Sequence, residues 1–177
     1  MLATLKQLPS QSAAWAVLAA SAWLLVAAAL YFQYGMGLEP CVKCIYQRVA
    51  IMAIGTVALL PLVAPRSRIA QWIGTLGWLI AAVKGYLIAA EHVALQNSTN
   101  AFFMVCDTFP NFPSFMPLHE WFPSIFGAPG LCGDIDWQFA GLSMPGWMQI
   151  IFAAYSVTAI LATFALIWAT LSRTTAK

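Results

Sequence analysis

Four cysteines are the residues whose chemistry stands out in this chain. Cys41 and Cys44 form a Cys-x-x-Cys motif, whereas Cys106 and Cys132 are widely separated. Such motifs commonly lower a thiol pKa and cycle between dithiol and disulfide. A bridge that closes so small a ring constrains the unfolded chain little, so the motif is better suited to chemistry than to stability. Four cysteines allow three pairings, and adjacency in the sequence favours Cys41–Cys44 and Cys106–Cys132.

Metal binding and a structural disulfide are the alternative uses of the Cys-x-x-Cys motif. Zinc sites usually combine two ligand pairs at short spacing, but here the second cysteine pair is split, and His92 and His119 lie elsewhere. We therefore expect no metal and favour a redox role. Cys106 and Cys132 either staple the segment between them or form an exposed disulfide that an incoming thiolate attacks. Spacing leaves both open, and the nearby motif favours the second.

The residues around Cys44 are suited to a reactive thiolate. Cys44 is predicted at the start of a helix, where unpaired backbone N–H groups and the positive end of the helix dipole favour a thiolate. Lys43 is its neighbour, and Arg48 lies four residues on, one turn deeper on the same helix face. Arg48 either takes part in the chemistry or is a snorkelling side chain at a membrane interface.

The composition places these residues in a membrane protein. Of 177 residues, 62% are hydrophobic and 8% are charged, against about 25% charged residues in a typical soluble domain. A soluble fold of this size cannot hide so much apolar surface, so the chain is predicted to lie in a lipid bilayer. The length allows one domain over residues 1–177. A net charge of +2 without a basic run argues against nucleic acid as a partner.

Four long apolar stretches are predicted to span the bilayer, at about residues 14–32, 45–64, 71–90 and 147–171. Each is close to the roughly 20 residues that a hydrocarbon core requires. Lipid offers the backbone no hydrogen-bond partners, so each stretch should be a helix. The predicted fold is an all-α membrane protein, a bundle of four transmembrane helices. The first stretch is longer than a signal-peptide core, so we expect it to be retained.

Lysine and arginine predict the orientation of the chain. They precede the first stretch, occupy the turn between the second and third, and follow the fourth: Lys6, Arg66, Arg68, Arg173 and Lys177. The positive-inside rule then places both termini in the cytoplasm. The loops at about 33–44 and 91–146 lie on the opposite side, which is the periplasm if the protein belongs to a bacterial inner membrane. All four cysteines fall on that oxidising side, where disulfides persist.

The predicted periplasmic loop 91–146 is unusual in composition. It contains five prolines between positions 110 and 129, which exclude long helices. It also contains many aromatic residues, which disordered segments lack. We expect the loop at the membrane surface, where aromatic side chains are common. The part 118–126 is either a short interfacial helix or an aromatic-rich loop packed on the helix ends.

The combination of these features resembles a known family, the bacterial disulfide bond formation protein B (DsbB) family. The matching positions are Pro40, Cys41, Cys44, Arg48, Glu91, His92, Cys106, Cys132, the stretch 136–139, Met144 and Pro145. Each motif alone is weak. Four spans with two outer cysteine pairs and an arginine one turn after Cys44 form a specific combination, and the resemblance covers nearly the whole chain.

The resemblance implies a protein dithiol:quinone oxidoreductase of the membrane. The family oxidises a thioredoxin-like periplasmic partner, DsbA, and reduces ubiquinone or menaquinone. By resemblance, the thiolate of the partner attacks Cys106 of a Cys106–Cys132 disulfide, and the electrons pass on to the Cys41–Cys44 pair. Cys44 then contacts the quinone, and Arg48 helps to hold it.

Residue chemistry fits these implied roles without excluding others. Arg48 is always protonated and can stabilise negative charge on quinone oxygens. His92 can donate a proton or a hydrogen bond, although an ordinary interfacial histidine is equally consistent with its position. The alternatives are a structural four-span protein with stapling disulfides, an oxidase of the same fold that serves one special partner, and a transporter, which the apolar first and fourth stretches disfavour. The sequence indicates neither the quinone type nor the roles of Lys43 and Lys84.

Overall fold

The structure is a computed structural model that describes residues 11–98, 107 and 109–174. Four long helices dominate it: α2 (Ser12–Gly35), α3 (Val42–Val63), α4 (Arg68–Asn97) and α7 (Met144–Thr174). Each is long and apolar enough to cross a membrane. The predicted all-α bundle of four transmembrane helices is therefore confirmed.

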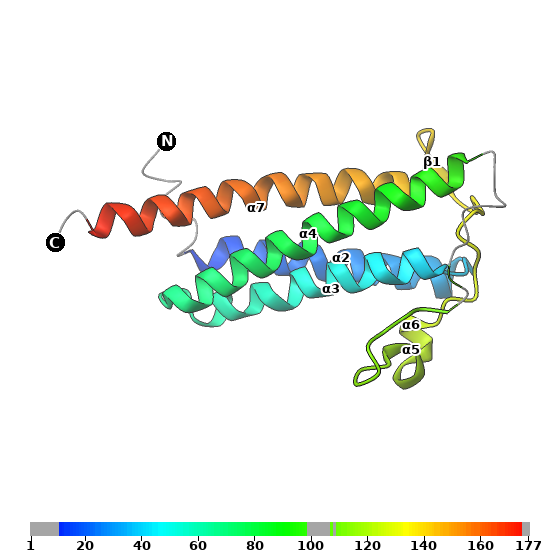
Figure 1. Ribbon diagram of the computed structural model, residues 1–177, viewed down its shortest axis with the longest axis horizontal. Coiled ribbons are helices and arrows are strands. Elements are labelled where there is room, and N and C mark those ends of the chain that lie inside the picture. Colours follow the sequence, from blue (N-terminus) through cyan, green and yellow to red (C-terminus); the bar gives the residue numbers. More distant parts are fainter. Residues whose placement is uncertain (1–10, 99–106, 108, 175–177) are drawn as a thin grey trace.

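The long helices pack in chain order. α2 contacts α3, α3 contacts α4, and α4 contacts α7. The shorter elements gather at the end of the bundle where α2 ends and α3 begins, and the turn between α3 and α4 lies at the other end (Figure 1). The Cys-x-x-Cys motif, α5, α6 and the strand β1 are thus at one end of the molecule, and the basic turn around residues 64–67 is at the opposite end.

Cys41 defines the start of α3 because it is the N-cap residue. Its Sγ accepts a hydrogen bond from the Cys44 N–H at 3.3 Å, as the Ser67 hydroxyl does from the Ala70 N–H at the start of α4. Side chains at this position satisfy backbone donors that a helix leaves unpaired. The Cys-x-x-Cys motif consequently occupies the first turn of α3.

α4 continues past the predicted stretch 71–90 and ends at Asn97. His92 is therefore on a helix instead of in the following loop. The apolar pattern stops where polar residues begin, but a helix need not stop there when its polar side chains find partners. Gln96 illustrates this, because its Oε1 accepts a hydrogen bond from the Ser143 hydroxyl at 2.7 Å.

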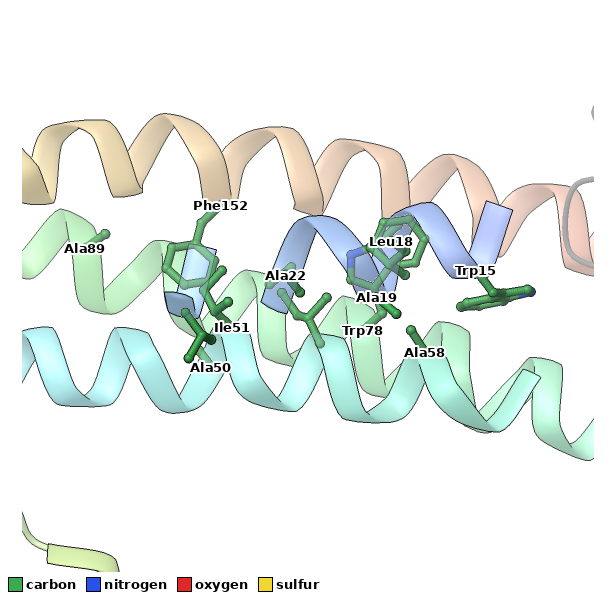
Figure 2. Packing of buried hydrophobic residues seen from close by; sticks show 14 residues of the cluster. Trp15, Leu18, Ala19, Ala22, Ala50, Ile51, Ala58, Trp78, Ala89 and Phe152 are labelled. Carbon is green, nitrogen blue, oxygen red and sulfur yellow. The ribbon is translucent and has the colours of Figure 1, made fainter. Parts of the chain in front are cut away.

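Small residues let the helices approach closely in the middle of the bundle (Figure 2). Five alanines there are fully buried: Ala22, Ala58, Ala82, Ala89 and Ala159. Gly85 on α4 faces the fully buried Phe152 on α7, and a Cβ added at Gly85 would lie 2.1 Å from the Phe152 ring. Close backbone approach of this kind is how helices associate in lipid, where no hydrophobic force drives them together.

The aromatic segment 118–126 forms two one-turn helices, α5 (Leu118–Trp121) and α6 (Pro123–Phe126), where one short helix was considered. They are separated at Phe122, whose φ of −134° and ψ of 65° are not helical. A residue that precedes proline avoids the helical region because it would clash with the proline ring. Several aromatic side chains near α5 are exposed: Phe109, Phe115, Trp121 and Phe122. Their position at a membrane surface stays a prediction.

A short β-hairpin precedes α7 and was not predicted from the sequence. β1 (Gln138–Phe139) pairs with β2 (Leu142–Ser143) in antiparallel fashion. The turn residues Ala140 and Gly141 both have positive φ, 51° and 79°, as a tight hairpin turn with the twist of its strands requires. The Trp147 Nε1–H donates to the Phe139 carbonyl at 2.9 Å, which fixes the hairpin on the first turn of α7.

Candidate functional site

Cys41 and Cys44 form a free thiol pair at the start of α3. Their Sγ atoms lie 2.8 Å apart, and Cys41 is only 3% exposed whereas Cys44 is partly exposed. The hydrogen bond with Cys44 and then burial raise the pKa of the Cys41 thiol above its ordinary value, and the contact with His92 acts in the opposite direction. Cys41 is therefore the thiol that stays protonated, and Cys44 is the more exposed residue of the pair.

His92 connects this thiol pair to the loop that contains Cys132, which we call the second cysteine loop. Its ring is 2% exposed. Nε2 lies 3.5 Å from Cys41 Sγ and 3.1 Å from the Cys132 carbonyl oxygen, and Nδ1 lies 3.3 Å from the Gln47 side-chain nitrogen. When the Gln47 amide donates to Nδ1, the proton of the neutral ring is on Nε2 and can be donated to the Cys132 carbonyl. Sequence reasoning found His92 but not its contacts with the Gln47 amide and the Cys132 carbonyl.

Cys132 lies beside the first cysteine pair and takes part in a disulfide. Its side chain is buried. Cys106, its predicted partner, lies outside the described residues, so the pairing stays a prediction. The loop is held close by Gly130, whose N–H donates to the Pro40 carbonyl at 3.1 Å. A Cβ at Gly130 would lie 2.4 Å from the Glu39 carbonyl oxygen, so only glycine fits this approach without movement.

Arg48 lies one turn after Cys44 and is 6% exposed. Its Nη1 donates to the Gln33 side-chain oxygen at 2.9 Å and to the Ile125 carbonyl at 2.5 Å. Its buried Nε has no hydrogen-bond partner. A snorkelling arginine would hold its charged head in water, whereas this guanidinium is enclosed by α2, α3 and α6. The Nε–H is thus a buried donor without a hydrogen bond, which is rare in folded proteins.

A cavity of about 110 Å³ joins these groups. Its polar wall contains five of the side chains described above: Cys41, Cys44, Gln47, Arg48 and His92. The remaining lining is mostly apolar, and α2 contributes four of these side chains, Leu25, Val26, Ala29 and Phe32. The cavity thus places a thiol pair and a buried cation against a surface that suits a hydrophobic ring compound.

The Lys43 side chain forms an ion pair with Glu91 and not with the neighbouring Cys44 thiol. Its Nζ lies 2.6 Å from Glu91 Oε2 in an ion pair, with the two side chains 23% and 62% exposed. A pair as exposed as this one contributes about 0.2–1 kcal/mol to stability. Its position links the first turn of α3 to the last turns of α4, next to His92. Neighbouring positions in the sequence therefore did not indicate which group Lys43 contacts.

Comparison with known proteins identifies the family. A family model described as "Disulfide bond formation protein DsbB" matches residues 11–162. The chain belongs to the DsbB family. It is 50% identical over 157 residues to the disulfide bond formation protein B of Idiomarina loihiensis, covering 89% of this chain and 87% of that protein. The protein of the same name from Pseudoalteromonas translucida is 46% identical, with coverages of 89% and 91%.

Membership of the DsbB family confirms the predicted resemblance and gives the coarse function. This chain is a multi-pass membrane protein of disulfide bond formation, with the role of a disulfide-forming oxidoreductase. A third relative, from Vibrio alginolyticus, is 44% identical over 86% of this chain. Of the predicted site residues, the structure brings Cys41, Cys44, Arg48 and His92 together and places Cys132 beside them.

Proposed function

We propose that this DsbB-family protein reoxidises a thioredoxin-like periplasmic dithiol protein of the DsbA type and transfers the electrons to a membrane quinone, ubiquinone or menaquinone. The observation that carries the proposal is the cavity in which the Cys41–Cys44 thiols and the buried Arg48 face an apolar wall. A soluble donor and a lipid-dissolved acceptor need a catalyst at the membrane surface, and this cavity lies where the helices end.

The residues around the cavity fit a quinone. Arg48 has a buried Nε without a partner, and a carbonyl oxygen in the cavity would satisfy it. The apolar wall from α2 suits the ring and the start of an isoprenoid tail. A bound quinone supplies an acceptor for two electrons and two protons. Arg48 would orient it and stabilise negative charge that develops on its oxygen, with Cys44 as the nearest accessible sulfur.

The first step that we propose is thiol–disulfide exchange at the second cysteine pair. The thiolate of the partner attacks Cys106 of the Cys106–Cys132 disulfide, so a mixed disulfide forms and Cys132 leaves as a thiolate. The second thiol of the partner then attacks the mixed disulfide. The partner departs with its own disulfide, and Cys106 and Cys132 are left reduced, holding the two electrons.

The second step transfers these electrons to the first pair. A thiolate of the second loop attacks the Cys41–Cys44 disulfide at Cys41, so a mixed disulfide forms between the two loops and Cys44 leaves as a thiolate. The other thiol of the second loop then attacks this mixed disulfide, which releases Cys41 as a thiolate and regenerates the disulfide of the second loop. His92 supports this route, because its Nε2 lies between Cys41 Sγ and the Cys132 carbonyl. After this step the second loop holds its disulfide again, and Cys41 and Cys44 are a dithiol.

The last step reforms the bond between the sulfurs of Cys41 and Cys44. Two electrons and two protons leave the dithiol for the quinone, and Arg48 holds the acceptor while this happens. The Sγ–Sγ distance of 2.8 Å means that the bond forms without a large rearrangement of the α3 start.

We also propose that the cysteine end of the bundle faces the periplasm of a bacterium, with both termini in the cytoplasm. The basic turn between α3 and α4 lies at the end of the molecule opposite to α5, α6 and β1 (Figure 1), which agrees with the positive-inside rule. The partner would then reach the second cysteine loop from the aqueous side, while the quinone reaches the cavity from lipid.

The test is an assay of quinone reduction. The purified protein is mixed with a reduced thioredoxin-like dithiol protein and a short-chain ubiquinone, and the loss of quinone absorbance is recorded over time. We expect turnover that disappears in Cys44→Ser and in Cys106→Ser. His119→Asn, on α5 away from the cavity, is the matched control and should retain turnover. Absence of turnover with every partner and quinone tested, with both disulfides intact, would favour a purely structural role for the disulfides.

A further inference from the structure

We propose that the reduced Cys41–Cys44 dithiol and His92 form a binding site for a thiophilic divalent cation, with Zn²⁺ as the ion that fits best. Their ligand atoms, two Sγ and one ring nitrogen, all lie within 4.8 Å of one another. Thiolate and imidazole are the ligands that zinc prefers, and three protein ligands with an open fourth position are typical of reactive zinc sites.

The distances require only a small adjustment to accept the ion. Zn–S bonds of about 2.3 Å and Zn–N bonds of about 2.1 Å in a tetrahedron separate neighbouring ligand atoms by roughly 3.6–3.8 Å. Cys41 Sγ and His92 Nε2 are already 3.5 Å apart. The two sulfurs, at 2.8 Å, must separate by roughly 1 Å, which a side-chain rotation of the partly exposed Cys44 supplies.

The surroundings of His92 resemble those of a metal ligand. Zinc-bound histidines almost always donate their second ring N–H to a neighbouring acceptor, which fixes the ring. Here Nδ1 lies 3.3 Å from the side-chain amide of Gln47, which is 3% exposed. Rotation of that amide by half a turn presents its oxygen to an Nδ1–H. Nε2 then exchanges its hydrogen bond with the Cys132 carbonyl for the metal.

Charge balance favours the ion in this buried place. Binding converts two thiols into thiolates and releases two protons to solvent, so Zn²⁺ and the two thiolates together are neutral. A neutral site avoids the cost of placing a net charge at low dielectric. All three ligands line the cavity, which has room for a water molecule as the fourth ligand, and a water ligand keeps the site neutral.

The consequence for turnover rests on the proposed function. The dithiol accumulates when quinone is scarce, because nothing then removes its electrons. Zinc would engage both sulfurs and so prevent them from forming a disulfide. The oxidised pair has no thiolates to offer, so the site exists in the reduced state alone. Spacing in the sequence did not indicate this site, because its third ligand comes from α4, 48 positions after Cys44.

The experiment is zinc titration of the reduced protein in competition with a chromophoric chelator. A Cys106→Ser/Cys132→Ser background removes the thiols of the second loop. We expect one ion per chain, with affinity reduced at least 100-fold by Cys44→Ser or His92→Ala and about 10- to 100-fold by Gln47→Leu, which leaves all three ligands in place. His119→Asn is the matched control and should bind as the parent does. Cobalt in place of zinc should give a thiolate-to-metal charge-transfer band.

Two results would overturn the site. One is equal binding by the oxidised protein, and the other is binding that survives Cys44→Ser and His92→Ala; either would indicate an adventitious ion only. The titration needs neither partner nor quinone, so it separates the two proposals. Zinc binding without quinone reduction would reject the proposed function and retain the site, whereas quinone reduction without zinc binding would reject the site alone.

Discussion

Gly130→Ala tests whether close contact between the two cysteine loops is needed for electron transfer. The added Cβ would lie 2.4 Å from the Glu39 carbonyl oxygen, and contacts under 3.0 Å are essentially never seen. The two segments must therefore separate by at least the difference between 3.0 and 2.4 Å, which is 0.6 Å. The hydrogen bond from the Gly130 N–H to Pro40, now 3.1 Å long, would stretch to about 3.7 Å and be lost.

The size of the effect follows from that displacement. A lost hydrogen bond costs about 0.5–1.5 kcal/mol, which is roughly a two- to thirteen-fold slower step when all of it is felt in the transition state. Misplacing reacting groups by about 1 Å costs up to about 100-fold. We expect transfer from the second cysteine pair to Cys41 and Cys44 to slow by roughly 3- to 30-fold. Transfer from these two cysteines to quinone should keep its rate.

The assay is rapid mixing of the protein with a reduced thioredoxin-like dithiol, followed by acid quench, alkylation and mass spectrometry of the peptide with Cys41 and Cys44. Gly133→Ala is the matched control, because it lies in the same loop and its added Cβ would meet no atom within 4 Å. A Gly130→Ala protein that transfers electrons within twofold of both the parent and Gly133→Ala would refute the reasoning.

Three further predictions concern packing, acceptor binding and thiol acidity. Gly85→Ala should destabilise the detergent-solubilised protein by roughly 1–3 kcal/mol, which is the effect of an overpacked core, because its Cβ would lie 2.1 Å from the Phe152 ring. The measurement is thermal unfolding, and Gly146→Ala is the control because its added Cβ would have its nearest contact at 3.5 Å. Arg48→Gln should raise the quinone KM roughly 10- to 150-fold, the value of a hydrogen bond to a charged group, and an unchanged KM would remove Arg48 from the acceptor site. The pKa of Cys41 is raised by its hydrogen bond to the neighbouring thiol and by burial, so its thiolate fraction lies below that of an unperturbed cysteine with a pKa of about 8.5. Its iodoacetamide alkylation in the reduced protein should stay slow up to about pH 9, and labelling faster than that of free cysteine near neutral pH would contradict this direction.

The four long helices could be predicted because their signal is local. An apolar run of about 20 residues has few other uses, and each helix contains such a run. The placement of Cys44 and Arg48 on one face of α3 is equally local, since it depends only on helical periodicity. Gln47 carried the same signal, three residues after Cys44, and a search for polar residues on that face would have found it.

The remaining contacts depend on how separate segments meet. His92 reaches Cys41 only through the register of α4 against α3, and nothing local specifies that register. Lys43 adjoins Cys44 in the sequence, but its side chain extends to Glu91 on another helix. The hairpin before α7 rests on positive φ at both turn residues, of which only the glycine gave a sequence signal. Tertiary packing decided these features, and no periodicity encodes them.

The most direct test of the proposed relay is to follow the Cys41–Cys44 pair through one cycle. Oxidised protein without bound quinone is mixed with one equivalent of a reduced thioredoxin-like partner, quenched with acid, and alkylated after denaturation. A second sample receives ubiquinone before the quench. We predict that both cysteines become alkylated in the first sample and protected again in the second, with the partner oxidised in both. A pair that stays protected in the first sample while the partner is oxidised, or stays alkylated after quinone is added, would contradict the account.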